Sequence, residues 1–240
     1  MGYDRISTLP DPLITEILLW LPTRDSVKTS VLSTRWRNLW LDVPGIDIKL
    51  PFSNANTITS FIKRFLEFNR DARLRKFKIT YDLSKVHPVG IREWIATAIS
   101  RGVQRLDVVD MLRVHADFVV SLPCLKNMHL EKTMCSGKDL SFMEKLISGC
   151  PVLEDLTVFR SSDDNVLVLR VISKSLKRFS VRSKRWSRIN NKEFALEIDA
   201  SGLKYMNLVD HQSERFVKNL SSFFMIDIDS IFNVGSWNRY

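Results

Sequence analysis

The amino-acid sequence predicts an α/β protein with two parts: three short helices at the N-terminus, then a short solenoid of strand-containing repeats with a parallel sheet. Three observations predict this fold. Apolar residues recur at helical spacing over the first forty residues, one six-residue motif recurs six times between residues 74 and 208, and helical patterns lie between its copies. The predicted boundary divides the chain into residues 1–45 and 46–240.

The first helix is expected to begin at Asp11, a suitable N-cap, with Pro12 at the first helical position, where its missing N–H costs nothing. Pro22 ends it. The apolar residues between them share one helical face: Leu13, Ile14, Ile17, Leu18 and Leu21.

Two further helices are expected before Pro44 and Gly45. Thr23 can cap the second. Ser33 or Thr34 can cap a third, which carries Trp36, Leu39 and Trp40 on one side. About forty residues form too small a core to bury so many large apolar side chains. The excess predicts either an exposed apolar patch that binds a partner or a stripe that packs on the rest of the chain.

Three short motifs in this part resemble an F-box. They are Leu-Pro-Asp at residues 9–11, Leu-Pro at 21–22 and Arg-Trp-Arg-x-Leu-Trp at 35–40. The likeness is greatest to plant F-box proteins with leucine-rich repeats, including the F-box/FBD/LRR kind, and it covers residues 4–44. Ser26 departs from the alanine that relatives often carry, and it is not expected to disturb the fold.

The resemblance implies a substrate receptor of an SCF-type ubiquitin ligase. Its F-box would dock on a Skp-family adaptor, and through it on a cullin and a RING protein, while the repeats hold a protein substrate. The receptor itself would carry no catalytic residues and no cofactor. The motif positions that would bind the adaptor or build the unit are Leu9, Pro10, Ile14, Ile17, Leu18, Leu21, Trp36 and Leu39.

The second part repeats the pattern L-x-x-L-x-L, which is typical of the strand in leucine-rich repeats. Its copies begin at Leu74, Val103, Leu125, Leu153, Leu176 and Leu203, 22 to 29 residues apart. A weaker seventh begins at residue 223, so six or seven irregular repeats are expected. Helices are expected over 58–68, 91–99 and 140–147, and added strands over 166–171 and 194–198. The alternative is an ordinary α/β domain with a parallel sheet.

Side chains alternate along a strand, so the motif's variable positions should line an open face. That row mixes both signs of charge with aromatic rings, which suits protein recognition. The predicted substrate-binding residues are Lys76, Lys78, Arg105, His129, Asp155, Phe159, Arg178, Arg182 and Tyr205.

The formal charge of +9 lies entirely after residue 50, because the first fifty residues carry six basic and six acidic side chains. Residues 174–192 carry eight basic side chains and no acid. That run could bind phosphates, bind an acidic protein, direct nuclear import or form a solvated face. A second cluster at Arg70, Arg73, Arg75, Lys76 and Lys78 could add to the open face. The alternative function is therefore a basic repeat protein that binds nucleic acid or another polyanion.

Other features of the sequence concern the cellular compartment, membrane spans and metal sites. Three cysteines in a long chain do not suggest a disulfide framework, so we expect the cytoplasm or the nucleus. No apolar run reaches the ~18 residues of a membrane span, and no metal-ligand spacing occurs. After residue 228 the repeat is lost, which resembles a short or truncated member of the family.

The two parts are expected to join without a flexible linker. Ile46, Ile48 and Leu50 alternate with polar residues, which predicts a strand that pairs with the first repeat. If Trp40 is buried at this junction, Trp40→Ala should cost about 3–5 kcal/mol.

Overall fold

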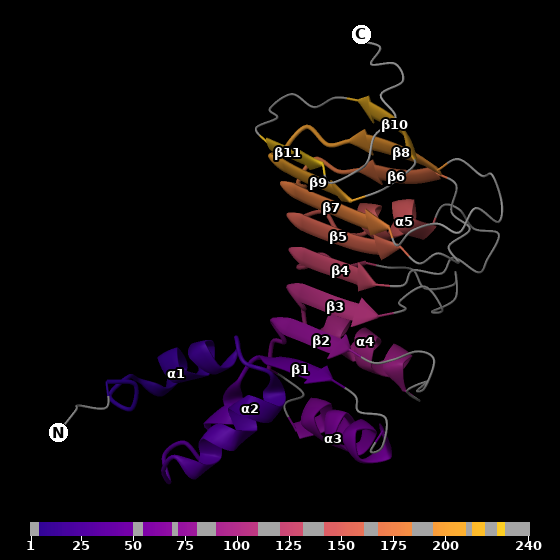
Figure 1. Cartoon of the computed structure of the whole chain (residues 1–240). Coiled ribbons are helices and arrows are strands. Elements are labelled where there is room, and N and C mark those ends of the chain that lie inside the picture. The colour runs from indigo at the N-terminus through magenta and orange to yellow at the C-terminus, as the bar shows by residue number, and fades with distance from the viewer. Residues whose placement is uncertain are drawn as a thin grey trace. The chain divides into compact units, whose positions relative to one another are not determined.

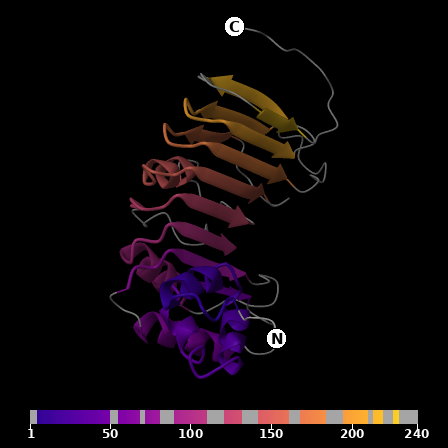
Figure 2. The same cartoon turned by 90° about the vertical axis from the view of Figure 1, so that its left-hand side faces the viewer.

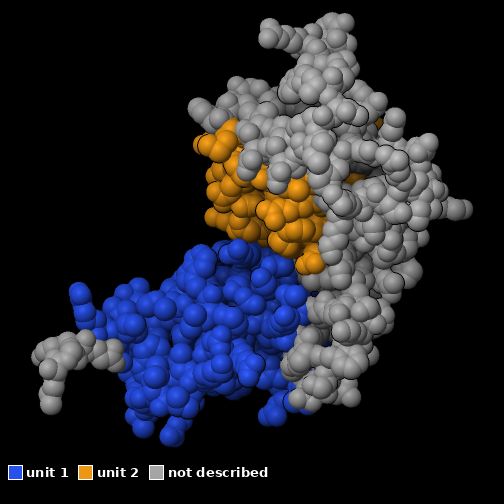
Figure 3. All heavy atoms as spheres, in the orientation of Figure 1, with its two compact units in different colours: residues 1–108 blue, residues 109–240 orange. Residues whose placement is uncertain are grey.

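A computed structural model describes residues 5–49, 55–68, 72–80, 90–109, 121–131, 142–160, 168–183, 194–209, 213–218 and 225–228. The chain forms two compact units, residues 1–108 and 109–240 (Figure 3). The first unit therefore contains both the N-terminal helices and the first strands of the repeat region. The predicted boundary at residue 45 lies inside the first unit, and it stays a prediction.

The N-terminal segment contains two α-helices, α1 (Asp11–Leu18) and α2 (Thr23–Lys28), followed by two short 3-10 helices, η1 (Thr29–Val31) and η2 (Leu39–Asp42). The prediction of a third α-helix after residue 33 is wrong. Trp36 faces the small core, whereas the ring of Trp40 stacks on Phe61. An α-helix puts residues i and i+4 on one face, so a regular helix could not aim both rings this way.

The predicted cap at Asp11 is also wrong. Pro10 is the N-cap of α1, and its carbonyl oxygen accepts from the backbone N–H groups of Leu13 and Ile14. Asp11 is already helical, and its carboxylate accepts a hydrogen bond from Arg35 Nε at 2.9 Å instead. The negative side chain still lies in the first turn, where the helix dipole favours it. Helix α2 likewise has no side-chain cap, because Pro22 precedes Thr23 as its N-cap.

The repeat region of the first unit contains three parallel strands and two helices (Figure 1): β1 (Gly45–Lys49), α3 (Ala55–Phe68), β2 (Lys76–Thr80), α4 (Ile91–Ser100) and β3 (Arg105–Val109). Ile46 pairs with Phe77 and Ile48 with Ile79, all of them buried. This confirms the predicted strand that follows Pro44 and Gly45. Helices α3 and α4 lie next to each other beside these strands (Figure 2).

The second unit contains a parallel sheet in the order β4, β5, β7, β9, β11. The bounds are β4 (Asn127–Glu131), β5 (Asp155–Arg160), β7 (Arg178–Ser183), β9 (Tyr205–Val209) and β11 (Met225–Ile228). A second parallel sheet has the order β10 (Ser213–Lys218), β8 (Phe194–Asp199), β6 (Val168–Ile172), and α5 (Phe142–Ser148) packs next to β6. The predicted strands and helices are thus confirmed, including the added strands near residues 166 and 194.

One backbone arrangement recurs from repeat to repeat. At five positions the carbonyl oxygen just before a strand accepts from two consecutive N–H groups at the start of the next strand in the sheet. Arg75 O accepts from residues 104 and 105, Lys126 O from 154 and 155, Glu154 O from 177 and 178, and Lys177 O from 204 and 205. Pro44 O does the same with the N–H groups of residues 75 and 76. The end of the N-terminal segment therefore pairs with the first motif as one repeat pairs with the next.

Candidate functional site

The N-terminal helices are built on a small apolar core. Its six buried members come from α1, from the turns after α2 and from the segment before β1, and Leu9 packs against them: Ile14, Leu18, Leu19, Trp36, Leu39 and Val43. The Trp36 ring donates a hydrogen bond from Nε1 to Ser7 Oγ at 3.2 Å. That bond satisfies the only polar atom of a ring that is otherwise buried.

Arg35 ties the start of the segment to the turn before η2. Its guanidinium group donates to the Asp11 carboxylate and to the backbone carbonyl oxygens of Ser7 and Leu9. A planar guanidinium group with several fixed donors can hold these acceptors at once, as an ammonium group cannot. The Leu-Pro-Asp motif is therefore held in place by the Arg-Trp-Arg motif, although 24 residues separate Asp11 from Arg35.

The opposite side of α1 is apolar and exposed. Leu13 is 51%, Ile17 44% and Trp20 74% exposed, and Leu13 and Ile17 are one helical turn apart on the same face. Leu21 follows at 37%. We call Leu13, Ile17, Trp20 and Leu21 the α1 stripe. Large apolar side chains gathered in this way are typical of a protein-binding surface.

The structure divides the predicted adaptor-binding residues into two groups. Ile14, Leu18, Trp36 and Leu39 are buried in the core, and Leu9 is half-buried against it. Pro10, Ile17 and Leu21 are exposed. A docking partner would touch the second group directly, and it would depend on the first group through the fold. Trp20 and Leu13 lie on the same exposed surface, but the motif comparison did not single them out. Helical spacing alone groups Leu13 with Ile17, whereas Trp20 follows the end of α1 at Leu18.

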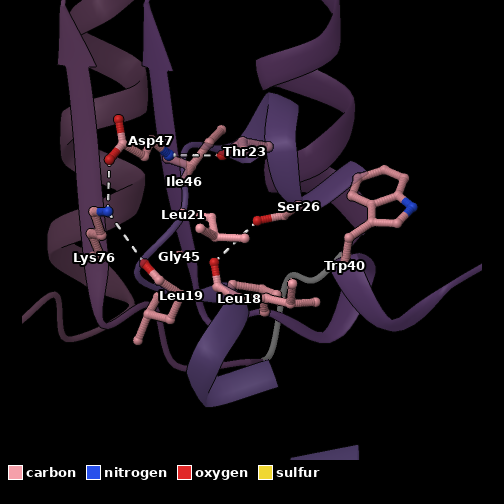
Figure 4. A pocket seen from close by; sticks show the side chains of 11 residues that line it. Leu18, Leu19, Leu21, Thr23, Ser26, Trp40, Gly45, Ile46, Asp47 and Lys76 are labelled. Carbon is pink, nitrogen blue, oxygen red and sulfur yellow. Dashed lines mark hydrogen bonds and ion pairs between the residues drawn. The ribbon is translucent and has the colours of Figure 1, made fainter. Parts of the chain in front are cut away.

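The helices are joined to the first repeat by a set of polar contacts (Figure 4). Thr23 Oγ1 accepts from the backbone N–H of Asp47 at 2.8 Å. Lys76 Nζ lies 2.6 Å from Asp47 Oδ2 and donates to Leu19 O at 3.2 Å. The side chains of Lys76 and Asp47 are only 12% and 19% exposed, so these contacts are shielded from water. We call Thr23, Asp47 and Lys76 the junction triad.

Two neighbours complete the junction. Arg75 forms an ion pair with Glu16 of α1. Gly45 is required by close approach, because a Cβ atom there would lie 2.5 Å from Leu19 Cδ1 and 2.9 Å from Lys76 Cβ. The hollow that remains between these residues has a volume of about 10 Å³, which holds no more than one water molecule. The junction is therefore a packed contact and not a ligand site.

Ser26 has a structural role at the same place. Its hydroxyl donates to Leu18 O at 3.0 Å and is buried. Leu18 O is one of the carbonyl groups that α1 leaves without a helical partner at its C-terminal end. The departure from alanine therefore adds a bond between α1 and α2 and does not disturb the fold.

The predicted substrate residues of the first unit are mostly engaged within the chain. Lys76 belongs to the junction triad, and Lys78 forms an ion pair with Asp107 at 3.1 Å. Arg105 is exposed. The second basic cluster is therefore neutralised only in part where it is described: Arg75, Lys76 and Lys78 each face a carboxylate, Arg73 is exposed, and Arg70 lies outside the described residues.

The predicted substrate residues of the second unit lie on one face of its sheet. Arg178 pairs with Asp155 at 2.9 Å across β7 and β5. Phe159 lies between two partners: the His129 ring centroid is 5.0 Å away, and Arg182 Cζ is 5.4 Å from the Phe159 ring centroid. Asn207 Nδ2 donates to the Tyr205 hydroxyl at 3.5 Å. This face therefore combines aromatic rings, hydroxyl groups and charge.

The basic run at residues 174–192 is described only up to residue 183. Within that part Lys177 pairs with Glu154 at 3.1 Å, and this contact holds the pKa of the Glu154 carboxyl below its usual range. Lys174 is exposed, and the residues from Lys184 onward lie outside the described residues.

Neither cysteine in the described ranges forms a disulfide. Cys124 is exposed, whereas Cys150 is buried and donates to Leu146 O at 3.0 Å. Burial raises the pKa of the Cys150 thiol to about 12, so this group is an inert part of the core. In the part of the chain that is described, no cluster of metal-ligating side chains occurs. No described helix has the length and apolar character that crossing a membrane requires.

Comparison with known proteins identifies both parts of the chain. The family model of the F-box domain matches residues 6–46, and a model described as the LRR repeats of the FBD-associated F-box protein At5g56370 matches residues 101–214. Similar proteins from Arabidopsis thaliana include the F-box/FBD/LRR-repeat protein At1g13780, 44% identical over 98% of this chain and 60% of the relative. The F-box/FBD/LRR-repeat protein At2g26030 is 43% identical over 98% and 60%. The FBD-associated F-box protein At5g27750 is 42% identical over 97% and 60%.

The chain thus spans about 60% of the length of the curated relatives that it matches. No solved structure gives a significant match.

Proposed function

Since this chain belongs to the plant F-box proteins with leucine-rich repeats, we propose that it is a substrate receptor of an SCF-type ubiquitin ligase. In this role the F-box docks on a Skp-family adaptor, and the adaptor connects it to a cullin and a RING protein. The repeats hold a protein substrate. The chain supplies no catalytic group, because ubiquitin transfer takes place on the partners. The cytoplasm or the nucleus is the proposed site of action.

The α1 stripe is the single observation that supports this proposal most strongly. Leu13, Ile17 and Trp20 are exposed, whereas Ile14 and Leu18 of the same helix form the core. Covering the stripe with a helical partner would remove its apolar surface from water, at about 25 cal/mol per Å². The proposed adaptor contacts are therefore Pro10, Ile17 and Leu21, together with Leu13 and Trp20.

The junction triad supports the second half of the proposal. A ligase that holds its substrate at a set distance from the transferring enzyme needs a rigid connection between docking and recognition. Glu16 of α1 forms an ion pair with Arg75, the residue before β2, and Lys76 of β2 donates to the carbonyl oxygen of Leu19, the C-cap of α1. Asp47 connects β1 to both Thr23 and Lys76. These contacts favour a fixed geometry between the F-box and the first repeat.

Polyanion binding has less support. On the first unit's strands, Lys76 and Lys78 face carboxylates within the chain, whereas Lys49 and Arg105 are exposed. Charges that are neutralised internally release fewer counterions from a nucleic acid.

Adaptor binding tests the proposal. The affinity of a purified Skp-family adaptor is measured for the full chain, for Ile17→Lys and for Ile172→Lys. Both isoleucines are exposed, at 44% and 58%, but Ile172 lies on β6 in the other unit. We expect Ile17→Lys to weaken binding at least about tenfold, since a charge would be buried in an apolar interface. Ile172→Lys should bind like the unchanged chain. Equal affinities for all three would overturn the proposal.

A further inference from the structure

The second unit carries a sheet face on which four strands expose three rows of polar and aromatic side chains. The pairing register aligns the rows: Asn127, Asp155, Arg178 and Tyr205; His129, Thr157, Ser180 and Asn207; Glu131, Phe159, Arg182 and Val209. Residues between these positions, such as Leu156 and Phe179, are buried, so the rows share the solvent side of the sheet.

The third row contains a cation, Arg182, whose surroundings differ from those of Arg178, the cation in the first row. Arg182 is exposed, and among the described residues no carboxylate lies within ion-pair distance of it. Its guanidinium group lies over the Phe159 ring, with Cζ 5.4 Å from the ring centroid. The equivalent cation of the first row, Arg178, is instead neutralised by Asp155 at 2.9 Å. Glu131 lies on the far side of Phe159, about two strand spacings (~9.5 Å) from Arg182.

The surroundings of Arg182 can accept both an anion and an apolar group. Ser180 and Thr157, both half-buried, carry hydroxyl groups in the neighbouring row, and hydroxyl groups can donate to a carboxylate. On the other side the rings of Phe159 and His129, with centroids 5.0 Å apart, form a half-buried aromatic surface whose apolar part is the Phe159 ring. A guanidinium group already held over a ring keeps its donors free at the edge of its plane. We call His129, Thr157, Phe159, Ser180 and Arg182 the Phe159 cluster.

We propose that the Phe159 cluster binds a protein segment that presents an acidic side chain next to an apolar one. The carboxylate would pair with Arg182 and accept from the hydroxyl groups of Ser180 and Thr157, and the apolar neighbour would lie on Phe159. This proposal rests on the proposed function, because it names the class of substrate that the repeats hold. Charge complementarity supports it: among the described residues the cluster holds one cation without a carboxylate partner, and the chain continues from Arg182 with Lys184, Arg185, Arg188 and Lys192.

The test is a binding titration of the full chain with labelled peptides of equal length. One peptide alternates glutamate with leucine, a second has glutamine in place of glutamate, and a third has lysine. Single-stranded DNA of the same charge as the first peptide serves as a polyanion probe. The variants are Arg182→Gln and, as a control with the same loss of charge, Lys204→Gln. Lys204 is an exposed lysine in the turn before β9.

We expect the glutamate–leucine peptide to bind and Arg182→Gln to lose about tenfold in affinity, the usual effect of one charge-assisted hydrogen bond. Lys204→Gln should stay within about twofold, because screening by salt weakens distant surface charges. A third variant, Arg182→Glu, reverses the charge and should prefer the lysine peptide. Failure of the unchanged chain to bind the glutamate peptide, equal binding of the glutamine peptide, equal losses in the two neutral variants or tighter binding of the DNA would each overturn the inference.

Adaptor affinity is measured on the same preparations. If adaptor binding holds and the peptide result fails, the substrate class is wrong and the receptor function stands. If adaptor binding fails while the peptide binds Arg182 as described, the cluster is an acidic-peptide site in a protein with another role.

Discussion

The first and the fifth copies of the repeat motif place a basic residue at the same position, yet the two residues have different surroundings. Lys76 on β2 and Arg178 on β7 each pair with an aspartate from the preceding strand in the sheet. The Lys76 side chain is 12% exposed and that of Arg178 is 59%. The difference arises because the helices of the F-box cover the first repeat, where Leu19 O adds a second acceptor for Lys76.

This difference shows what the F-box does for the repeats. The first strand of a solenoid needs a cap for the surface that no earlier repeat covers. Here β1, which continues directly from the F-box, pairs with β2 and supplies Pro44 O to the backbone arrangement that links later repeats. The F-box end thus serves as the missing earlier repeat, and the two parts of the first unit depend on each other for stability.

The largest expected effect on stability comes from substitutions on the two faces of α1. Leu18→Ala should lower the free energy of unfolding by about 2–5 kcal/mol, because Leu18 is 1% exposed in the F-box core. Ile17→Ala, one residue earlier, should change it by less than about 1 kcal/mol. Chemical denaturation of the two variants checks this. A smaller loss for Leu18→Ala than for Ile17→Ala would mean that the core and the stripe are assigned to the wrong faces.

Gly45→Ala should cost about 1–3 kcal/mol, because its Cβ would overlap Leu19 Cδ1 and Lys76 Cβ. The double variant with Leu19→Ala provides the control. Removing the Leu19 side chain opens room for the new methyl group, so the two losses should be less than additive. Strictly additive losses in thermal or denaturant unfolding would show that the close approach at the junction does not exist.

A further variant, Trp40→Ala, tests how much the contact between Trp40 and Phe61 stabilises the first unit. Trp40 is half-buried, with its ring stacked on Phe61 at 6.2 Å between centroids. The condition for the full loss of 3–5 kcal/mol, a buried ring, is therefore not met, and we expect about 1–3 kcal/mol. Denaturant unfolding measures the loss. Unchanged stability together with weakened adaptor binding would instead place Trp40 in the partner interface.

The smallest expected effect is the difference in stability loss between variants of Lys76 and Arg178, the two cations at the equivalent motif position. Lys76→Met leaves Asp47 partly buried without its cation, so we expect a loss of about 1–3 kcal/mol. Arg178→Met breaks an exposed pair and should cost no more than about 1 kcal/mol. The midpoints of denaturant unfolding decide between them. If the two variants were equally stable, the F-box would not shield the first repeat.

Local patterns were enough to predict most of the elements, because strand and helix periods are visible within a few residues. The strands at β2, β5 and β7 and the helices α3 to α5 follow directly from them. The third helix could not be predicted correctly, since the directions of Trp36 and Trp40 depend on partners far along the chain. The role of Lys76 was hidden for the same reason: its partner Leu19 is 57 residues away. The motif assigned Lys76 to the open face, and only the packing of the F-box shows otherwise.

The sequence predicts that an exposed apolar patch could exist in the N-terminal part, but not which residues form the α1 stripe. Counting large apolar residues predicted an excess over the capacity of the core, but the count could not say which residues were left outside. Ile17 and Leu18 are neighbours in the chain, and their side chains are isomers of similar hydrophobicity. Only the packing of α1 distinguishes them.

Hydrogen exchange tests the central claim, that the F-box and the first repeat form one cooperative unit, most directly. The amides of α1 and α2 are compared with those of β1 and β2 in the full chain under native conditions. Our account predicts that the most protected amides of both groups open with the same free energy, and that Gly45→Ala lowers both by the same amount. F-box amides that exchange at a lower free energy, and that are unaffected by Gly45→Ala, would contradict it.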